Sequence, residues 1–294
     1  MKRVSVVIPN HNYAQFVGAA VEGALAQTYP VFEVIVIDNG STDNSLKVLE
    51  KFGSKIRIIA QENRGQSGAR NRGIEESRGD FVAFCDADDV WQPRKIEEQM
   101  KLFTSPEIGL VYCGYSLANA KLEIIKNVIP ENRGKLLSLF ADGAAAVIPA
   151  GESSVVIRKE CFAEAGTFDP DFSISAGFDL YRRIAQRFEI DLVPQALVLY
   201  RQHATNTSRR LDAYANDYLR AIDKMFSDPG AAELLPLRRR CLGRAHVSLS
   251  GAYIQSREIR KSLRHLALGL RYAPQEIGYV LKTPVRVIRR RLDG

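Results

Sequence analysis

The feature that most constrains this chain is an alternation of short apolar runs with helical patterns over its first hundred residues. The apolar runs have the length of strands and the composition expected of strands buried on both faces. They are Val4–Ile8, Val34–Ile37, Ile56–Ile59 and Phe81–Phe84. Helical spacing separates them, as where Val17, Val21 and Leu25 recur at intervals of four residues. Strands alternating with helices predict an α/β fold with an open, mainly parallel sheet, right-handed crossovers and helices on both faces.

The rest of the chain divides into two stretches. Strand-like runs continue at Ile108–Cys113 and Ser154–Ile157. From about Ala213 onward the pattern is helical throughout. We therefore predict a sheet domain over residues 1–210, divided near residue 105 into two halves, and a helical C-terminal region over residues 211–294.

Charge is distributed unevenly along the chain. The net formal charge is +7, but Arg238–Gly294 alone carries fourteen Lys/Arg against three Asp/Glu, which leaves the preceding part at −4. Basic and apolar residues interleave there in two predicted amphipathic helices, Arg257–Tyr272 and Val285–Leu292. Such helices bind anionic membrane surfaces, although a solvated helix packed on the domain has the same pattern. We expect an anionic membrane surface as partner and no nucleic acid, because no nucleic-acid-binding motif is present.

Hydropathy and cysteine usage indicate the compartment. No stretch approaches the twenty apolar residues of a transmembrane helix, and the N-terminus lacks the apolar core of a signal peptide. The four cysteines are scattered without a CxxC pair, which is typical of reduced structural thiols. We expect a cytoplasmic protein that associates peripherally with the inner face of the membrane.

Polar residues follow three of the predicted strands at the point where each strand ends. Pro9-Asn10-His11-Asn12 follows the first strand, and Asp38 ends the second. Asp86-Ala87-Asp88-Asp89 follows the fourth. In open parallel sheets, ligands bind at the carboxyl ends of the strands. We therefore expect these three segments to converge on one crevice.

The carboxylate cluster is the sharpest of these signals. Asp86, Asp88 and Asp89 place like charges close together, and such charges destabilise one another unless a cation lies between them. Carboxylate oxygens suit Mg²⁺ or Mn²⁺, which commonly bind through one or two carboxylates plus substrate phosphates. The alternative interpretation is an acidic turn that caps the following helix, with Asp89 as the cap and Pro93 in the first turn.

Two other groups have both a binding and a structural interpretation. An acid such as Asp38 at the end of the second strand is typical of ribose binding, but the GxGxxG motif of dinucleotide-binding folds is absent. A helix-capping turn is its structural alternative. The glycine-rich stretch with Arg64, Arg70 and Arg72 is typical of a phosphate cradle, but more commonly of a solvated helix face.

Taken together, four segments in this order resemble the family 2 glycosyltransferases, which have the GT-A fold. The segments are Val4–Asn12, Val36–Asp43, Asn63–Gly73 and Gly79–Asp89. The likeness is strong to residue 105 and looser to about residue 210. It implies a nucleotide-sugar-binding half over residues 1–105, an acceptor half over residues 106–210 and a basic helical C-terminal region over residues 211–294.

The resemblance implies a metal-dependent, inverting transfer of a sugar from a nucleoside-diphosphate sugar, with UDP as the expected nucleotide. The acceptor would be a hydroxyl of a surface glycan or a lipid-linked sugar. Asp88 would bind Mn²⁺ or Mg²⁺ together with His203, and the metal would stabilise the leaving diphosphate. A lone histidine such as His203 also has an ordinary structural interpretation. The implied donor-binding residues are Pro9, His11, Asn12, Asp38, Arg70, Asp86, Ala87 and Asp88.

The catalytic base departs from the family pattern. Family members commonly carry Glu-Asp just before an Asp-Leu that opens a helix, and here Ala176 and Gly177 take those positions. Asp179 is the carboxylate left in that segment, and we name it as the candidate base, with helix capping as the alternative. A relocated base at one of three other acids is also compatible with the sequence: Asp169, Asp171 or Glu152.

Two alternative functions stay open. A missing base is typical of a non-catalytic nucleotide-sugar-binding protein. A nucleotidyltransferase shares a similar fold and a similar use of metal and carboxylates. It would, however, carry a Gly-rich loop with Arg or Lys after the first strand, where this chain has Pro9–Tyr13.

Overall fold

The computed structural model describes residues 2–143, 147–149, 151–203, 206 and 210–274. The chain forms two compact units. The sheet unit comprises Met1–Lys135 and Ile148–Asn206, and the helical unit comprises Leu136–Val147 and Thr207–Gly294. The short segment 136–147 thus groups with the C-terminal helices. The division near residue 210 into independent domains stays a prediction.

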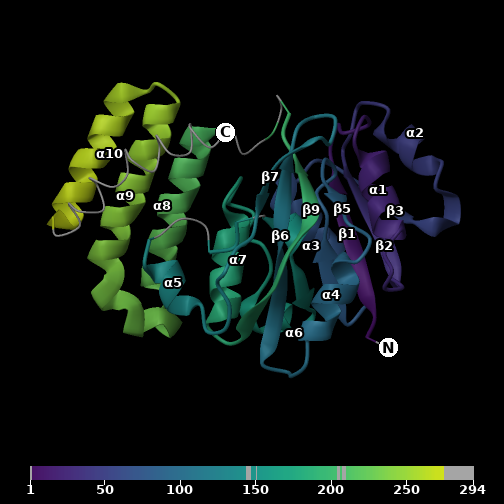
Figure 1. Cartoon of the computed structure of the whole chain (residues 1–294), viewed down its shortest axis with the longest axis horizontal. Coiled ribbons are helices and arrows are strands. Elements are labelled where there is room, and N and C mark those ends of the chain that lie inside the picture. Colours follow the sequence, from purple (N-terminus) through teal and green to yellow (C-terminus); the bar gives the residue numbers. More distant parts are fainter. Residues whose placement is uncertain (1, 144–146, 150, 204–205, 207–209, 275–294) are drawn as a thin grey trace. The chain divides into compact units, whose positions relative to one another are not determined.

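One half of the sheet is parallel. Its strands pair in the order β3 (Arg57–Gln61), β2 (Glu33–Asn39), β1 (Val4–Asn10) and β4 (Phe81–Phe84). Figure 1 labels the first three of these strands. The first strand is therefore central, and each later strand is added through a helical connection. All four strands direct their carboxyl ends to one edge of the sheet, which is where ligands bind in such folds.

The other half of the sheet is mixed. β8 (Val156–Arg158) pairs antiparallel with β4 and with β6 (Ile108–Ala118), while β6 runs parallel to β9 (Glu189–Arg201). Two short strands, β5 (Val90–Trp91) and β7 (Ile124–Val128), pair antiparallel with β9 and β6. The expected α/β fold with a mainly parallel sheet is confirmed.

Helices cover both faces of the parallel half. The helical elements of the sheet unit are α1 (Val17–Leu25), α2 (Ser45–Glu50), η1 (Gly53–Lys55), α3 (Gly65–Glu76), α4 (Lys95–Leu102), η2 (Glu152–Ser154), α6 (Glu160–Ala165) and α7 (Ala176–Ala185). On one face of β1, Val6 shares a core with Val17 of α1. Val7 points to the other face, because side chains alternate along a strand. There a Cβ on Gly73 would lie 2.1 Å from Val7, so the glycine lets α3 approach β1 closely.

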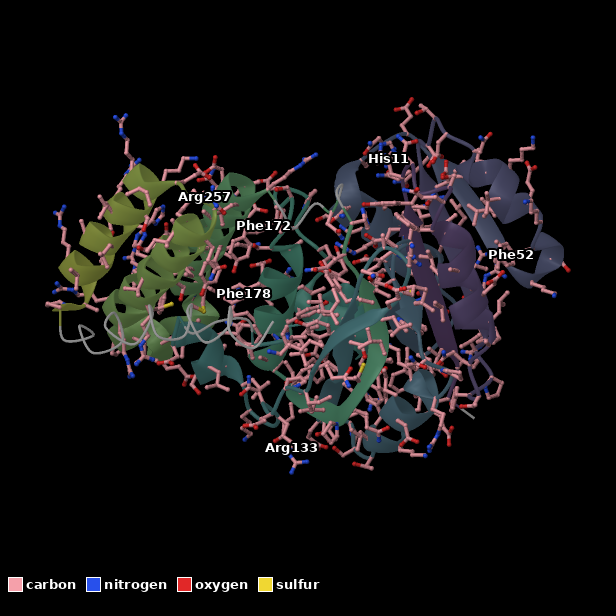
Figure 2. The ribbon with its side chains drawn as sticks, turned by 45° about the horizontal axis from the view of Figure 1, so that its top comes forward. His11, Phe52, Arg133, Phe172, Phe178 and Arg257 are labelled. Carbon is pink, nitrogen blue, oxygen red and sulfur yellow. The ribbon has the colours of Figure 1, made fainter. Side chains whose placement is uncertain are left out.

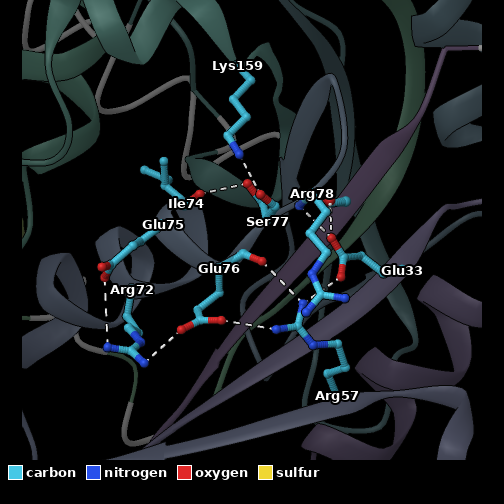
Figure 3. A network of polar contacts seen from close by, with 10 residues as sticks. Glu33, Arg57, Arg72, Ile74, Glu75, Glu76, Ser77, Arg78 and Lys159 are labelled. Carbon is cyan, nitrogen blue, oxygen red and sulfur yellow. Dashed lines mark hydrogen bonds and ion pairs between the residues drawn. The ribbon is translucent and has the colours of Figure 1, made fainter.

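A network of charges joins the opposite edge of the parallel strands (Figure 3). Arg57, at the start of β3, donates to Glu33 at 2.7 Å and to Glu76 at 3.0 Å. Glu33, at the start of β2, also accepts from the Ser5 hydroxyl of β1 at 2.7 Å. One guanidinium therefore ties two strands to the last residue of α3. These charges lie where the strands begin, so we assign them a structural role.

The helical unit contains α5 (Leu137–Ala141), α8 (Leu211–Ser227), η4 (Pro229–Leu237), α9 (Arg238–Gln255) and α10 (Ile259–Tyr272). The predicted tail helix from Arg257 to Tyr272 is confirmed as α10. Small residues pack it on α9. A Cβ on Gly269 would lie 2.8 Å from Val247, and the hydroxyls of Ser262 and Ser250 are 3.0 Å apart.

The first part of the apolar side of α10 is exposed, while Leu266 and Leu270 further along it are half-buried. Ile259 is 56% exposed and Leu263 is 60% exposed, with Arg260 and Arg264 exposed beside them. The second predicted tail helix, Val285–Leu292, lies outside the described residues. Within the part of the chain that is described, no helix has the length and apolar character needed to cross a membrane.

Candidate active site

The carboxyl ends of β1 and β2 are joined by hydrogen bonds around Asp38. Asp38 is buried, and its carboxylate accepts from the Asn10 side chain at 3.0 Å and from the Ser41 N–H at 3.2 Å. The Asn10 amide also donates to the Ser41 hydroxyl at 3.1 Å. A carboxylate has about four lone-pair sites. Asp38 therefore retains acceptor capacity toward a ligand at this edge.

Three further predicted donor-binding residues lie on or beside β1. The backbone of Asn12 is left-handed, with φ of 58°, and its side-chain oxygen accepts from the Thr42 N–H at 2.7 Å. Asn12 thereby fixes the turn that follows β2. His11 is exposed (Figure 2), with Nε2 3.2 Å from the Asn63 side-chain nitrogen. Pro9 is half-buried within β1. Their contacts with a donor stay predictions.

Arg70 and Asp86 form the centre of the site. Arg70 lies on α3 and is buried; it donates to Asp86 at 2.8 Å and lies 3.3 Å from Glu152. Its guanidinium carbon is 5.5 Å from the centre of the Phe168 ring. Burial alone would lower the pKa of Arg70, but the charges of Glu152 and Asp86 raise it above the ordinary value. The interpretation of these arginines as a solvated helix face is therefore wrong for Arg70. It holds for Arg72, whose side chain is 40% exposed.

Asp88 faces His203, which lies 115 residues further along the chain, just after β9. Asp88 Oδ2 is 2.9 Å from His203 Nε2 and 3.4 Å from the Asn206 amide. Burial and the nearby Asp86 carboxylate raise the pKa of Asp88 above its ordinary value. Ala87 is buried in the apolar core beneath the turn.

Asp89 connects two segments of the sheet unit. Its carboxylate accepts from the Ser153 hydroxyl at 2.6 Å and from the Arg201 N–H at 3.0 Å. The following helix, α4, begins only at Lys95 and has no side-chain cap. The interpretation of Asp89 as a helix cap is therefore wrong. Burial, together with the charges of the neighbouring aspartates, raises the pKa of Asp89 well above its ordinary value.

The turn η2 belongs to the site although no motif marks it. Ser153 accepts from the Asp86 N–H at 3.0 Å, and its carbonyl accepts from the Trp91 indole at 2.9 Å. The Ser154 carbonyl accepts from the Gln99 side chain at 2.8 Å. These bonds fix η2 on the acidic turn and place Glu152 beside Arg70. From the sequence, Glu152 is only one of several acids near the missing base.

Asp179, the candidate base, is held by arginines of its own helix. Its carboxylate accepts from Arg183 at 3.0 and 2.8 Å and from Arg182 at 3.4 Å. Both Arg183 bonds go to the same oxygen, Oδ2, and hydrogen bonds between charged groups are stronger than neutral ones. This pairing supports a structural role inside α7, and the assignment of Asp179 as base stays a prediction. Among the described residues, no three or more His, Cys, Asp or Glu side chains are grouped so as to hold a metal ion.

Comparison with known proteins shows which family carries these motifs. A model of glycosyl transferase family 2 matches residues 5–157, which is just over half of the chain and includes the acidic turn. The chain belongs to glycosyltransferase family 2. An uncharacterised glycosyltransferase of Nostoc sp. is 32% identical over 220 residues, which cover 69% of this chain and 66% of that protein. Escherichia coli WfgD, a UDP-Glc:alpha-D-GlcNAc-diphosphoundecaprenol beta-1,3-glucosyltransferase, is 34% identical over 149 residues, 49% of this chain and 59% of WfgD. The matched part of this family 2 chain therefore spans 66% and 59% of the length of these two relatives.

Solved structures show the same fold. The first 349 residues of S. aureus TarS, in complex with UDP-GlcNAc, are similar over 99% of this chain and 88% of that one, with a TM-score of 0.69 and 14% identity. The Pyrobaculum calidifontis mannosyltransferase PcManGT, in complex with GDP-Man and Mn²⁺, is similar over 98% and 87%, with a TM-score of 0.59 and 16% identity. The expected GT-A type architecture is confirmed.

Proposed function

We propose that this chain transfers a sugar from a UDP-sugar to a hydroxyl group of a lipid-linked or surface-glycan acceptor. The observation that carries the proposal is the set of acidic residues at the carboxyl edge of the parallel strands, with the buried cation Arg70 behind them. Membership of the family supports the reaction class. UDP as the nucleotide is supported by two similar proteins: WfgD is named for UDP-Glc, and TarS was solved in complex with UDP-GlcNAc.

The donor would lie across the ends of β1, β2 and β4. Asp38 would accept a hydrogen bond from the base, with Pro9, His11 and Asn12 around the base and ribose. Arg70 would provide positive charge near the diphosphate. A donor held in this way exposes its anomeric carbon to an acceptor, and single inversion follows when a hydroxyl attacks that carbon directly.

A divalent metal fits Asp88 and His203. Ligand atoms next to one another around an octahedral ion at about 2.1 Å lie about 3 Å apart, and Asp88 Oδ2 and His203 Nε2 are 2.9 Å apart. Carboxylate and imidazole both suit Mn²⁺, and Mg²⁺ accepts the carboxylate. Two protein ligands are enough where substrate phosphates complete the shell. When bound, the metal would stabilise the charge of the leaving nucleoside diphosphate.

Metal removal tests this proposal. We expect UDP, titrated by calorimetry, to bind at least about tenfold more tightly with Mn²⁺ than in EDTA, because that factor corresponds to only about 1.4 kcal/mol. UDP-glucose, UDP-GlcNAc and GDP-mannose should then be screened for nucleotide release with a GlcNAc-diphospholipid acceptor. Equal UDP affinity with and without metal would contradict the metal site. Tight binding without turnover on any acceptor would favour the non-catalytic alternative, and pyrophosphate release from UTP and a sugar phosphate would favour a nucleotidyltransferase.

We further propose that α10 attaches the protein to the cytoplasmic face of an anionic membrane. Its exposed Ile259 and Leu263, flanked by Arg260 and Arg264, support this role. Apolar side chains bury into the headgroup boundary while arginines contact anionic lipid. A lipid-linked acceptor would be found at the same surface.

Flotation with vesicles of phosphatidylcholine and phosphatidylglycerol measures this attachment. We expect the full chain to float with the vesicles. The Ile259→Glu/Leu263→Glu variant should stay in the bottom fraction of the gradient, because two charges replace the apolar contact. The matched control is Ile124→Glu/Ile125→Glu, which changes two equally exposed isoleucines on β7 and should float normally. Equal recovery of all three proteins would rule out α10 as the attachment site.

A further inference from the structure

We propose that Glu152 is the general base of the transfer reaction and takes the proton of the acceptor hydroxyl. The inference rests on the proposed function above and deepens it. It assigns to η2 the carboxylate that family members carry on the helix at Ala176 and Gly177. Four observations support it: the space at Gly177, the contact with the donor site, the environment of the carboxylate and the state of Asp179.

The carboxylate of Glu152 occupies the space in front of Gly177. A Cβ on Gly177 would lie 2.5 Å from Glu152 Oε1 and 3.1 Å from the Tyr181 ring. Such a contact is too short to exist, so a side chain at 177 and the present position of Glu152 exclude one another. The chain therefore has a carboxylate where a side chain from 177 would begin, and it comes from a different element.

Glu152 is tied to the donor site through Arg70. Arg70 Nη2 lies 3.3 Å from Glu152 Oε2 and 2.8 Å from Asp86 Oδ1, so one guanidinium joins the two carboxylates. The next residue, Ser153, bonds to the Asp86 N–H and to the Asp89 carboxylate. These bonds hold η2, and with it Glu152, against the acidic turn that carries the proposed metal ligand Asp88.

The surroundings of Glu152 suit a proton acceptor. Burial and the charge of Asp86 raise its pKa above the ordinary value, although Arg70 opposes this. A carboxylate with a raised pKa is a more effective base near neutral pH. Its side chain is 11% exposed. Next to it, the buried Tyr181 hydroxyl has no hydrogen-bond partner among the described residues, which leaves a polar group for a bound acceptor.

Asp179 is less suited to this role. Arg183 donates twice to Asp179 Oδ2, and Arg182 lies 3.4 Å from Oδ1. Its side chain is fully buried. The Asp179 carboxylate is thus already engaged by two arginines of its own helix.

The proposed step balances as a direct displacement. The acceptor oxygen forms a new bond to the anomeric carbon as the bond between that carbon and the diphosphate oxygen breaks. The electron pair of the broken bond leaves with the nucleoside diphosphate. The proton of the acceptor hydroxyl passes to the Glu152 carboxylate and from there to solvent. Arg70 keeps the carboxylate in place.

Glu152→Gln separates this role from donor binding. With the donor and acceptor found in the screen above, we expect kcat to fall by about 100-fold or more, which is the usual contribution of a general base. The affinity for UDP with Mn²⁺, measured by calorimetry, should stay near that of the unaltered protein. Glu160→Gln makes the same change at an exposed position on α6 and should keep full kcat. Unfolding temperatures confirm that each variant is folded.

Two more variants test the position of the carboxylate. Gly177→Ala keeps every charge but forces Glu152 aside, so it should lower kcat without weakening UDP binding. Glu152→Gly combined with Gly177→Asp moves the carboxylate to the helix, into the space that Glu152 leaves. We expect it to recover at least about tenfold in kcat over Glu152→Gly alone, a small part of what a positioned base contributes.

The following results would overturn the inference. Full kcat in Glu152→Gln, or loss of kcat and UDP binding together in a folded variant, excludes Glu152 as the base. Full kcat in Glu152→Gln with loss in Asp179→Asn assigns the base to Asp179. Failure of the proposed function looks different, because the unaltered protein would then neither bind UDP nor release it from a donor.

Discussion

Replacing Asp88 with alanine should lower kcat/KM for sugar transfer by about a thousandfold or more. A metal that stabilises a departing diphosphate contributes several kcal/mol, and each 1.36 kcal/mol is a factor of ten in rate. Asp88 provides the carboxylate 2.9 Å from His203, so its loss removes half of the proposed protein ligands. UDP binding should also lose its dependence on Mn²⁺. Steady-state kinetics and calorimetry of the same protein measure both effects.

The fold itself should tolerate Asp88→Ala. The change removes one of three neighbouring aspartates, Asp86, Asp88 and Asp89, and so reduces the repulsion among them. Its matched control is Asp80→Ala, which removes an exposed aspartate paired with Arg3 at the other edge of the sheet. That variant should keep its activity and its response to Mn²⁺. A Mn²⁺ dependence of UDP binding that is the same in Asp88→Ala and in the unaltered protein would show that the metal is held elsewhere.

Replacing Arg70 with methionine should destabilise the protein by about 3–5 kcal/mol. That is the usual cost of removing one partner from a buried ion pair, because the other charge is left without compensation. The Arg70 side chain is only 4% exposed and balances both Asp86 and Glu152. Methionine keeps much of the volume against Phe168, so the lost charge dominates the effect. Denaturant unfolding followed by circular dichroism measures the free energy of unfolding.

Arg72→Met is a close control because it lies on the same helix. Arg72 is 40% exposed and pairs at the surface with Glu76, so its removal should cost less than about 1 kcal/mol. Adding Glu152→Gln to Arg70→Met should recover part of the lost stability, since one uncompensated charge is then neutral. Equal unfolding free energies for Arg70→Met and Arg72→Met would mean that the buried charges find other compensation.

Much of the donor half follows from local patterns in the sequence. The apolar runs around Val6, Ile35 and Val82 predict buried strands, and the helical spacing of Val17, Val21 and Leu25 predicts the helix observed as α1. Both signals depend on residues a few positions apart, so they survive without knowledge of the rest of the fold. Parallel strands share one carboxyl edge, so the sequence also predicts that Asp38 and Asp86 lie at the same edge of the sheet.

Other features depended on segments that meet only in the folded chain. The sequence pattern alone allowed Arg70 to lie on a solvated face, but two carboxylates on separate turns surround it. Likewise, the apolar stripe of α10 predicts a helix without showing which face packs. Close approach of α10 to α9 requires small residues, so Gly269 lies against α9 while Leu263 is exposed.

The sequence by itself determined the alternation of strands and helices over the first hundred residues, the family and the acidic turn. Only the tertiary structure decided which acid stands where the missing base was expected. Gly177 and Glu152 are 25 positions apart, and neither is unusual alone. Their relation is steric: the absence of one side chain makes room for the carboxylate of another. A contact of this kind leaves no repeating pattern in the sequence, so only the packing of the folded chain specifies it.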